Sequence, residues 1–198
     1  MNKTRGRGRP AGPSHTREQI LAVARRRFLA EGYQRVTLRS IAAEAGVDVA
    51  LISYFFGSKS GLFGATMSLS VNPARAVASA LPGDLNALPE RLLTVLVTTW
   101  DDPDRGPALR AMAEAGARDP DVRRLLRELV YGEIIARLAE RLGGADATAR
   151  AGMAAAQIVG IIFGRYVLGL EPLASMPAEE VVRRSAPAMR AALAGPRR

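Results

Sequence analysis

The stretch that most constrains the fold runs from residue 37 to residue 59 and reads TLRSIAAEAGVDVALISYFFGSK. Thr37 is a good N-cap residue, and the short apolar pattern after it stops at Gly46, which is free to adopt the left-handed conformation that closes a helix. Asp48 can cap a second short helix, in which Ile52 and Phe56 lie four residues apart on one face. The spacing therefore predicts a helix-turn-helix.

The residues that follow these two helices add a candidate phosphate contact. Ser58 can cap a third helix, whose free backbone N–H groups would attract an anion such as a DNA phosphate, with the Lys59 ammonium beside them. A cap, a glycine and two short apolar helices also describe structural helical hairpins. The spacing alone thus leaves DNA binding and a purely structural hairpin both open.

The longer segment GYQRVTLRSIAAEAGVDVALISYFFGSKSGLF resembles the DNA-binding segment of the tetracycline-repressor (TetR) family of bacterial transcriptional regulators, and the likeness covers about residues 16–63. The shared features are the Gly-aromatic turn, the helix-turn-helix and the Phe-Gly-Ser-Lys exit. The resemblance implies an all-α fold of about nine helices, with a three-helix DNA-binding head on a helical body that binds ligand and dimerises. It further implies a cytoplasmic repressor that binds a palindromic double-stranded DNA operator as a homodimer and is released by a small-molecule effector.

Two runs in the body, VNPARAVASAL and the Arg-Tyr-Val-Leu…Glu-Pro-Leu-Ala run, also resemble a group of actinobacterial members of that family. The expected division of the chain is a disordered basic arm at residues 1–14, the helix-turn-helix domain at 15–60 and the ligand-binding and dimerisation domain at 61–198.

The composition argues against catalysis and metal binding. The chain has no cysteine and a single histidine, His15, which lies in a polar N-terminal segment. Disulfides, thiolate metal sites and cysteine nucleophiles are therefore excluded, and a zinc site or histidine-based acid–base catalysis is not expected. No spaced carboxylate pair or phosphate loop is present. We expect no enzyme activity, no cofactor and no metal.

The positive charge is concentrated in the N-terminal third. The chain carries a formal charge of +9, and residues 1–60 hold 11 Lys/Arg against 4 Asp/Glu. A basic balance beside a helix-turn-helix is the electrostatic pattern of a nucleic-acid binder, although a solubilising tail would share it. Residues 1–14 have no apolar region that could form a secretory signal, and their composition predicts disorder.

Within this arm, Arg5, Arg7 and Arg9 alternate with other residues in a run that resembles the Arg-Gly-Arg-Pro core of an AT-hook. Such an arm can place guanidinium groups in the narrow minor groove of A·T tracts.

Further apolar patterns predict helices over most of the remaining chain. Ser14 or Thr16 is expected to cap the first long helix, which ends near Gly32, and Tyr33 and Val36 should fill the core of the head. The helix that Ser58 caps should continue from residue 59 to about 71 and join head to body, so a ligand that changes its angle would change the separation of the two heads in a dimer. Helices are then expected at residues 85–100, 108–117, 120–142, 147–170 and 178–193.

The segment from residue 147 to 170 is the most apolar of the chain. Its length raises a membrane span, but Gln157 and Arg165 lie inside it, and an arginine within a span is costly. We therefore expect no membrane partner. A row of small residues spaced four apart allows a close helix approach and is expected to form the dimer interface: Gly152, Ala156, Gly160 and Gly164. In the resemblance, the helices near 120–142 and 147–170 form a four-helix dimer bundle.

By position in the family motif, Thr37 and Lys59 should bind phosphates, and Ser53 and Tyr54 should lie along the DNA backbone. Ser53 stands where the family often has tyrosine, and Phe55 stands where it often has histidine or tyrosine. Both phosphate contacts are for that reason in doubt.

Arg39 can reach a base edge, where bidentate contact with guanine O6 and N7 is the strongest chemistry available to it. Val49 and Ala50 face the bases in the family motif but offer only methyl contacts, and Leu51 completes the expected DNA-binding set.

The effector cannot be identified from the sequence. Large side chains of the body could line its pocket, although residues of this kind are more often plain core: Met67, Trp100, Met112, Tyr131, Phe163 and Tyr166. Arg165 lies in so apolar a helix that it needs a partner, which could be Glu133, Glu114 or an acidic group of the effector.

Two other functions stay open. An architectural protein that uses its basic arm without sequence preference would bind operator and random DNA with the same salt dependence. A small-molecule carrier or enzyme with a structural helix-turn-helix would not bind DNA at all.

Overall fold

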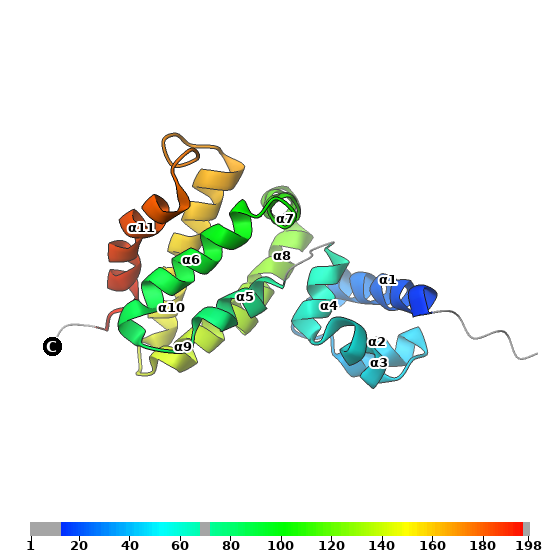
Figure 1. Cartoon of the computed structure of the whole chain (residues 1–198). Coiled ribbons are helices and arrows are strands. Elements are labelled where there is room, and N and C mark those ends of the chain that lie inside the picture. The colour runs from blue at the N-terminus through cyan, green and yellow to red at the C-terminus, as the bar shows by residue number, and fades with distance from the viewer. Residues whose placement is uncertain (1–12, 68–71, 196–198) are drawn as a thin grey trace, which may run out of the picture.

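The computed structural model describes residues 13–67 and 72–195, and across these ranges the protein is built from helices with no strand (Figure 1). Four helices make an N-terminal head: α1 (Pro13–Glu31), α2 (Leu38–Ala45), α3 (Val49–Phe56) and α4 (Lys59–Thr66). The predicted all-α class is confirmed, and so is the predicted order of the helices in the head.

The caps of the head follow the local sequence. Thr37 Oγ1 accepts a hydrogen bond from Ser40 N at 3.0 Å, and Gly46 closes α2 with φ +63°. Asp48 Oδ1 accepts from Ala50 N at 2.7 Å at the start of α3. Ser58 Oγ accepts from Gly61 N at 3.0 Å at the start of α4. The helix-turn-helix predicted from these residues is therefore present.

The start of the first helix differs from the prediction. α1 begins at Pro13, so Ser14 and Thr16 lie inside its first turns and neither caps it. Proline has a fixed φ that suits the first position of a helix and lacks an N–H that would need a partner there.

The body follows as a set of packed helices and helical turns: α5 (Pro73–Ala80), η1 (Leu85–Ala87), α6 (Leu88–Asp101), α7 (Gly106–Arg118), α8 (Pro120–Leu129), η2 (Val130–Ile135), α9 (Ala136–Leu142), α10 (Ala147–Ile161), η3 (Ile162–Val167) and α11 (Ala178–Leu193). The turns η2 and η3 are π-helical and continue the helices before them. The segment α8–η2–α9 is thus one continuous helix over residues 120–142, as predicted.

One helix and two helix ends differ from the prediction. Helix α5 was not predicted, and it starts where Asn72 Oδ1 accepts hydrogen bonds from the backbone N–H groups of the first turn. The predicted helix over 59–71 ends at Thr66, and residues 68–71 lie outside the described ranges. The helix predicted over 147–170 ends at Val167, before Gly169 with φ +62°.

Apolar side chains form two buried clusters. The body cluster is built mainly from α6, α7, α9, α10 and α11, with α6 packed against α11. The head cluster centres on Phe28, Tyr33 and Phe63, whose rings contact one another, and Tyr33 and Val36 are buried there as predicted. This cluster also takes in Leu125 and Leu129 of α8, so a helix of the body completes the core of the head.

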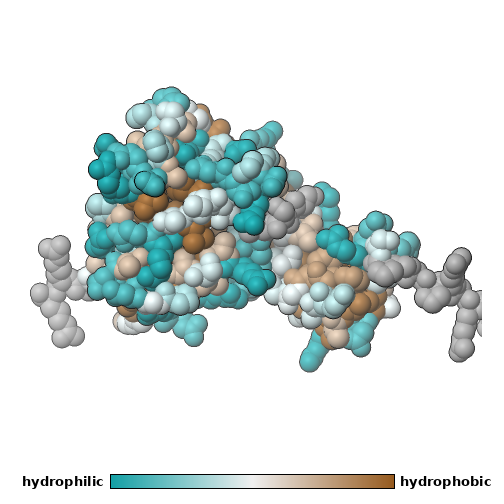
Figure 2. Space-filling view, in the orientation of Figure 1, coloured by the Kyte–Doolittle hydropathy of each residue, from teal (hydrophilic) through white to brown (hydrophobic). Residues whose placement is uncertain are grey.

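The outer surface is mostly hydrophilic in the view of Figure 2, with hydrophobic residues gathered in a hollow of the body and on the head. Figure 1 shows α8 running toward the head, beside α1 and α4. Contacts between head and body are therefore concentrated at one helix.

Candidate functional site

The helix-turn-helix presents one exposed row of side chains. Thr37 and Arg39 at the start of α2 are exposed, and so are Val49, Ala50 and Ser53 of α3. Tyr54 is 81% exposed, whereas Ile52 on the opposite side of α3 is fully buried. The buried side holds the helix in the head, and the exposed side is free to contact a partner.

Arg39 has no hydrogen bond or ion pair to any residue in the described parts of the chain. Leu51 and Phe55 are half-buried, and the Phe55 ring packs against the rings of Tyr54 and Phe56. The Phe55 ring therefore packs against the exposed Tyr54 ring, and it offers no hydrogen bond to a phosphate.

Lys59 is placed differently from the other predicted DNA contacts. Its Nζ donates a hydrogen bond to the Gln34 carbonyl oxygen at 3.2 Å and lies 4.4 Å from the centre of the Tyr33 ring. Burial lowers the pKa of the Lys59 ammonium, against the opposing effect of Glu133 and Glu128. Lys59 is half-buried, and its ammonium is held by these two contacts on the side of the head that faces the body.

The turn between α1 and α2 is hydrogen-bonded to the body. The Tyr33 hydroxyl donates to Glu133 Oε1 at 2.9 Å, and Gln34 N donates to Glu128 Oε2 at 2.9 Å. Burial and the Glu133 carboxylate raise the pKa of Tyr33 above its ordinary value, so the hydroxyl stays a donor. The turn therefore binds two carboxylates, one on α8 and one on η2.

Further contacts tighten this junction. Gln34 Nε2 donates to the Glu128 carbonyl oxygen at 3.0 Å, and Arg124 donates to the Leu29 carbonyl oxygen at 2.7 Å. Gly32, with φ +86°, leaves only 2.9 Å between an added Cβ and the Glu128 carboxylate. The backbone conformation at this position therefore favours glycine, and a larger residue would push the Glu128 carboxylate away from Gln34 N.

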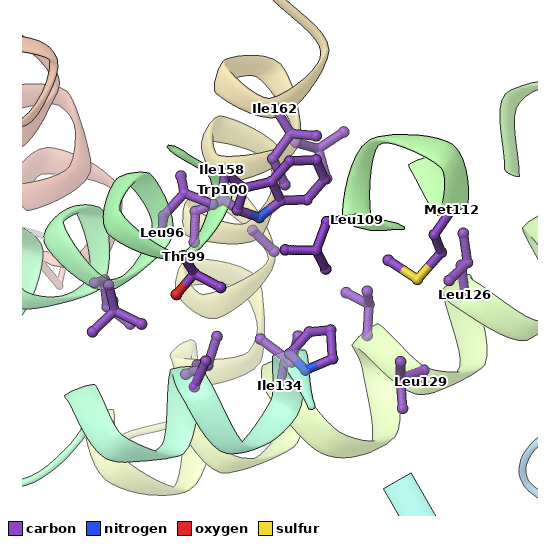
Figure 3. Close-up of a pocket in the computed structure, with 18 residues that line it drawn as sticks. Leu96, Thr99, Trp100, Leu109, Met112, Leu126, Leu129, Ile134, Ile158 and Ile162 are labelled. Carbon is purple, nitrogen blue, oxygen red and sulfur yellow. The ribbon is translucent and has the colours of Figure 1, made fainter. Parts of the chain in front are cut away.

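The body holds an apolar cavity of about 140 Å³ that is partly open to the surface. Figure 3 shows side chains that converge on it from several helices, among them Leu96, Thr99 and Trp100, with Met112 and Leu126 opposite them. The residues that line it come from α5, α6, α7, α8, η2, α10 and η3: Pro73, Ala76, Val77, Leu92, Val95, Leu96, Thr99, Trp100, Leu109, Met112, Leu126, Leu129, Val130, Ile134, Ala155, Ile158, Val159 and Ile162. An apolar volume of this size can hold a small molecule.

One continuous helical segment, α8–η2, serves both the cavity and the head. Leu126, Val130 and Ile134 line the cavity, while Glu128 and Glu133 of the same segment hold the turn of the head. Leu129 contributes to both, since it lines the cavity and belongs to the head cluster. A ligand that displaces this segment in the cavity would therefore also displace the residues that hold the head.

The predicted pocket residues divide into three groups. Trp100 and Met112 line the cavity of about 140 Å³. Tyr131 and Phe163 line a neighbouring, more open hollow that shares Trp100 and Met112 with it. Three others line neither hollow: Met67, Arg165 and Tyr166.

Arg165 has a partner that the sequence analysis did not name. It pairs with Asp101 at 3.2 Å and also donates to the carbonyl oxygens of Leu173 and Met176 at 2.5 and 2.7 Å. The proposed pairing with Glu133 or Glu114 is wrong, because those carboxylates bind Arg137 and Arg118 one helical turn away. An effector carboxylate is not needed to neutralise Arg165.

The row of small residues on α10 and η3 is exposed in its middle part. Ala156 and Gly160 are exposed, and a Cβ added at Gly152 or Gly160 would meet no atom within 4 Å. Gly164 is instead buried, and an added Cβ would lie 3.1 Å from Leu173 Cδ2. The free part of the row thus ends before Gly164.

Neighbouring residues extend this free part into an apolar surface. Met153 is 63% exposed and Val159 is 46% exposed. Helix Ala147–Val167 is long and apolar enough to cross a membrane, but a single helix of this kind is weak evidence, since core helices of soluble proteins share the property.

Sequence analysis missed several residues that the structure brings together. Glu128, Val130 and Thr99 carry no local motif, and Glu133 was named only as a possible partner of Arg165. The helical periodicity around residues 120–142 indicated that Glu128, Val130 and Glu133 share a helix. Within the described residues no group of three or more His, Asp or Glu side chains could hold a metal ion. Arg5, Arg7 and Arg9 lie outside the described residues.

Comparison with known proteins adds the family. A family model described as the tetracyclin repressor-like C-terminal domain matches residues 86–193, and one for bacterial regulatory proteins of the tetR family matches residues 20–66. The HTH-type transcriptional regulator BetI of Burkholderia mallei is 28% identical over an alignment of 165 residues, with 79% of this chain and 84% of BetI covered.

Solved structures give similar matches. A TetR-family regulator from Streptomyces coelicolor A3 is 33% identical, with 95% of this chain and 99% of that chain covered and a TM-score of 0.49. A transcriptional regulator from Saccharomonospora viridis in complex with choline is 22% identical, with 86% and 93% covered and a TM-score of 0.42.

The C-terminal family model alone covers more than half of the chain, and the N-terminal model covers the helix-turn-helix described above. The predicted family and the predicted role in transcription are confirmed by these matches. The chain belongs to the TetR family of ligand-responsive, DNA-binding transcriptional regulators.

Proposed function

We propose that this protein is a cytoplasmic repressor that binds a palindromic operator as a homodimer and leaves it when a small molecule enters the cavity of the body. The observation that carries the proposal is the double role of α8–η2, which lines the cavity on one side and holds the head on the other. Ligand binding there can bias the position of the head.

The exposed row of the helix-turn-helix is the proposed DNA surface. Arg39 is unpaired and has the chemistry to read guanine, while Val49 and Ala50 can contact thymine methyl groups. Thr37, Ser53 and Tyr54 are exposed beside them and can donate to phosphates. The arm, through Arg5, Arg7 and Arg9, would add minor-groove contacts.

Lys59 contributes less directly in this proposal. Its ammonium would have to leave the Gln34 carbonyl oxygen and the Tyr33 ring before it could reach a phosphate. We therefore assign Lys59 to the junction of head and body.

The free face of α10 is the proposed dimer interface. Ala156 and Gly160 leave room for a close helix approach, and Met153 and Val159 would lose water-exposed apolar surface on dimerisation. A twofold dimer carries two heads, and two heads related by this symmetry match a palindromic site.

Release requires that the ligand bind the free and DNA-bound arrangements with different affinity. The cavity supplies this condition if the spacing of α8–η2 from α6 and α10 differs between the two arrangements. The turn at Tyr33 and Gln34 would then transmit the change to the head, because both residues are hydrogen-bonded to that helix.

The test is titration of the purified protein into the DNA just upstream of its own gene, with an excess of random DNA present. A footprint on a palindromic site, bound by a dimer, is the expected result. Binding to random DNA with equal affinity and equal salt dependence would instead indicate an architectural protein. Absence of binding at low salt would contradict the DNA-binding proposal.

A further inference from the structure

The lining of the cavity restricts what can bind there. Of the described residues that line it, none carries a charge, and Thr99 contributes the only side-chain hydroxyl. The Trp100 indole N–H adds a second hydrogen-bonding group. The rest of the wall is made of aliphatic side chains, proline and methionine, so the site favours an apolar ligand.

The volume sets the size of the ligand. An apolar cavity of about 150 Å³ in another protein stays dry and takes up benzene. The present cavity, at about 140 Å³, is of that size. One six-membered ring with a small substituent would fill it without displacement of the surrounding helices.

Charged ligands lack a counter-charge. A buried ion without a partner is strongly unfavourable, and a quaternary ammonium group needs an aromatic cage or a carboxylate. Trp100 is the one aromatic residue among those that line the cavity. Asp101 follows Trp100 on α6, but its carboxylate is paired with Arg165, so neither charged group is available to a ligand.

Two polar groups identify one end of the site. Thr99 and Trp100 are consecutive on α6, and both side chains extend into the space that Leu109 and Ile134 face from other helices (Figure 3). No residue in the described ranges accepts a hydrogen bond from the indole N–H or pairs with the Thr99 hydroxyl. The indole can only donate, whereas the hydroxyl can donate and accept.

We propose that the effector is an uncharged, apolar molecule of about one ring that places a single hydroxyl or carbonyl oxygen against Thr99 and Trp100. This inference rests on the proposed function only for the word effector. The binding of such a molecule is a property of the cavity and can be measured without DNA.

Trp100 makes the experiment direct, because it is the only tryptophan of the chain. Intrinsic fluorescence and the thermal unfolding midpoint are followed while the protein is titrated with toluene, 4-methylphenol, benzoate or choline. We expect saturable changes with toluene and 4-methylphenol, and about two- to tenfold tighter binding of 4-methylphenol because of its hydroxyl. Benzoate and choline should cause no saturable change.

Two variants connect the signal to this cavity. Ala76→Leu adds bulk to the cavity wall and should weaken the binding of toluene at least tenfold, whereas Ala78→Leu on the same helix, away from the wall, should leave it unchanged. Thr99→Val keeps the shape and removes the hydroxyl, so it should reduce the preference for 4-methylphenol while toluene still binds.

Three results would overturn the proposal: no saturable binding of either uncharged compound, tighter binding of benzoate or choline, or equal loss of toluene binding in the two alanine variants. None of these results would affect operator binding. Conversely, if 4-methylphenol binds as expected but leaves the protein on its operator, the ligand class stands and the release proposed above fails.

Discussion

The two sides of the head use their polar residues in opposite ways. On the side of α2 and α3, Arg39 and Tyr54 are exposed, and Arg39 has no partner in the described residues. On the side of the body, Tyr33, Gln34 and Lys59 are hydrogen-bonded or packed against a ring. Arg39 and Tyr54 thus have little part in holding the fold together, whereas Tyr33, Gln34 and Lys59 are tied to the rest of the protein by hydrogen bonds.

This difference predicts that DNA affinity and stability can be changed separately. Substitutions of Arg39 or Tyr54 on the DNA side should lower operator affinity without a change in the free energy of unfolding. Substitutions on the body side should change the free energy of unfolding and the response to ligand.

The largest effect is expected from Gly32→Ala on the body side. Alanine is strained at φ +86°, and its Cβ would lie 2.9 Å from the Glu128 carboxylate. We expect a loss of about 2–3 kcal/mol in the free energy of unfolding, measured by chemical denaturation. Gly46→Ala is the matched control, because Gly46 has φ +63° but no atom within 4 Å of an added Cβ.

The control should lose about 1 kcal/mol in the free energy of unfolding, which is the cost of placing alanine in a left-handed conformation. Equal losses in the two variants would show that displacement of the Glu128 carboxylate does not contribute to the loss of stability in Gly32→Ala.

On the DNA side, Arg39→Ala should cost about 1–3 kcal/mol of operator binding and relax the preference at one base position. Since Arg39 is exposed and unpaired, the free energy of unfolding should change by less than about 0.5 kcal/mol. Binding to a set of operators substituted at single positions is the measurement. A uniform loss over all sequences would make Arg39 a phosphate contact.

Tyr33→Phe removes one hydrogen bond from the body side. The Glu133 carboxylate keeps Arg137 at 2.7 Å but loses the Tyr33 hydroxyl, so we expect a loss of about 1–2 kcal/mol in the free energy of unfolding. Tyr54→Phe, on the exposed DNA side, is the control and should leave stability unchanged. A comparable loss in both variants would contradict the division between the two sides.

The same division explains how much of the structure could be predicted from the sequence. The caps at Thr37, Asp48 and Ser58 depend on residues two or three positions away, so local sequence is sufficient to place α2, α3 and the start of α4. The pairs Tyr33–Glu133 and Gln34–Glu128 join residues about a hundred positions apart. Such pairs depend on the packing of whole helices, which periodicity does not determine.

Arg165 illustrates this limit. The argument that a charge in an apolar helix needs a partner was correct, but the partner is Asp101, at the C-terminal end of α6. The sequence offered several carboxylates and no way to choose among them, because the choice depends on which end of α6 lies beside η3. The cavity could not be predicted for the same reason, because its wall is built from seven segments whose packing the sequence pattern does not determine.

Lys59→Ala tests which side of the head this residue serves. If its ammonium stays with Gln34 and Tyr33, the slope of log affinity against log salt should match that of the unmodified protein, with a loss of about 0.5–1 kcal/mol in stability. A phosphate contact in each protomer would instead reduce the slope by about 1.8 for the dimer, which is about 0.9 for each lost contact. Operator titrations at several salt concentrations distinguish the two outcomes.

The smallest effect is expected from Gly160→Ala, and its sign depends on protein concentration. In the isolated chain an added Cβ at Gly160 meets no atom within 4 Å, so the helix should gain up to about 1 kcal/mol because alanine favours helix more than glycine does. In the proposed dimer the same methyl group would separate two closely packed helices. We therefore expect a higher unfolding midpoint in dilute solution and a weaker dimer by sedimentation at high concentration. A gain in stability at every concentration, with unchanged dimerisation, would place the interface elsewhere, because a close-packed α10 face has no room for the methyl group.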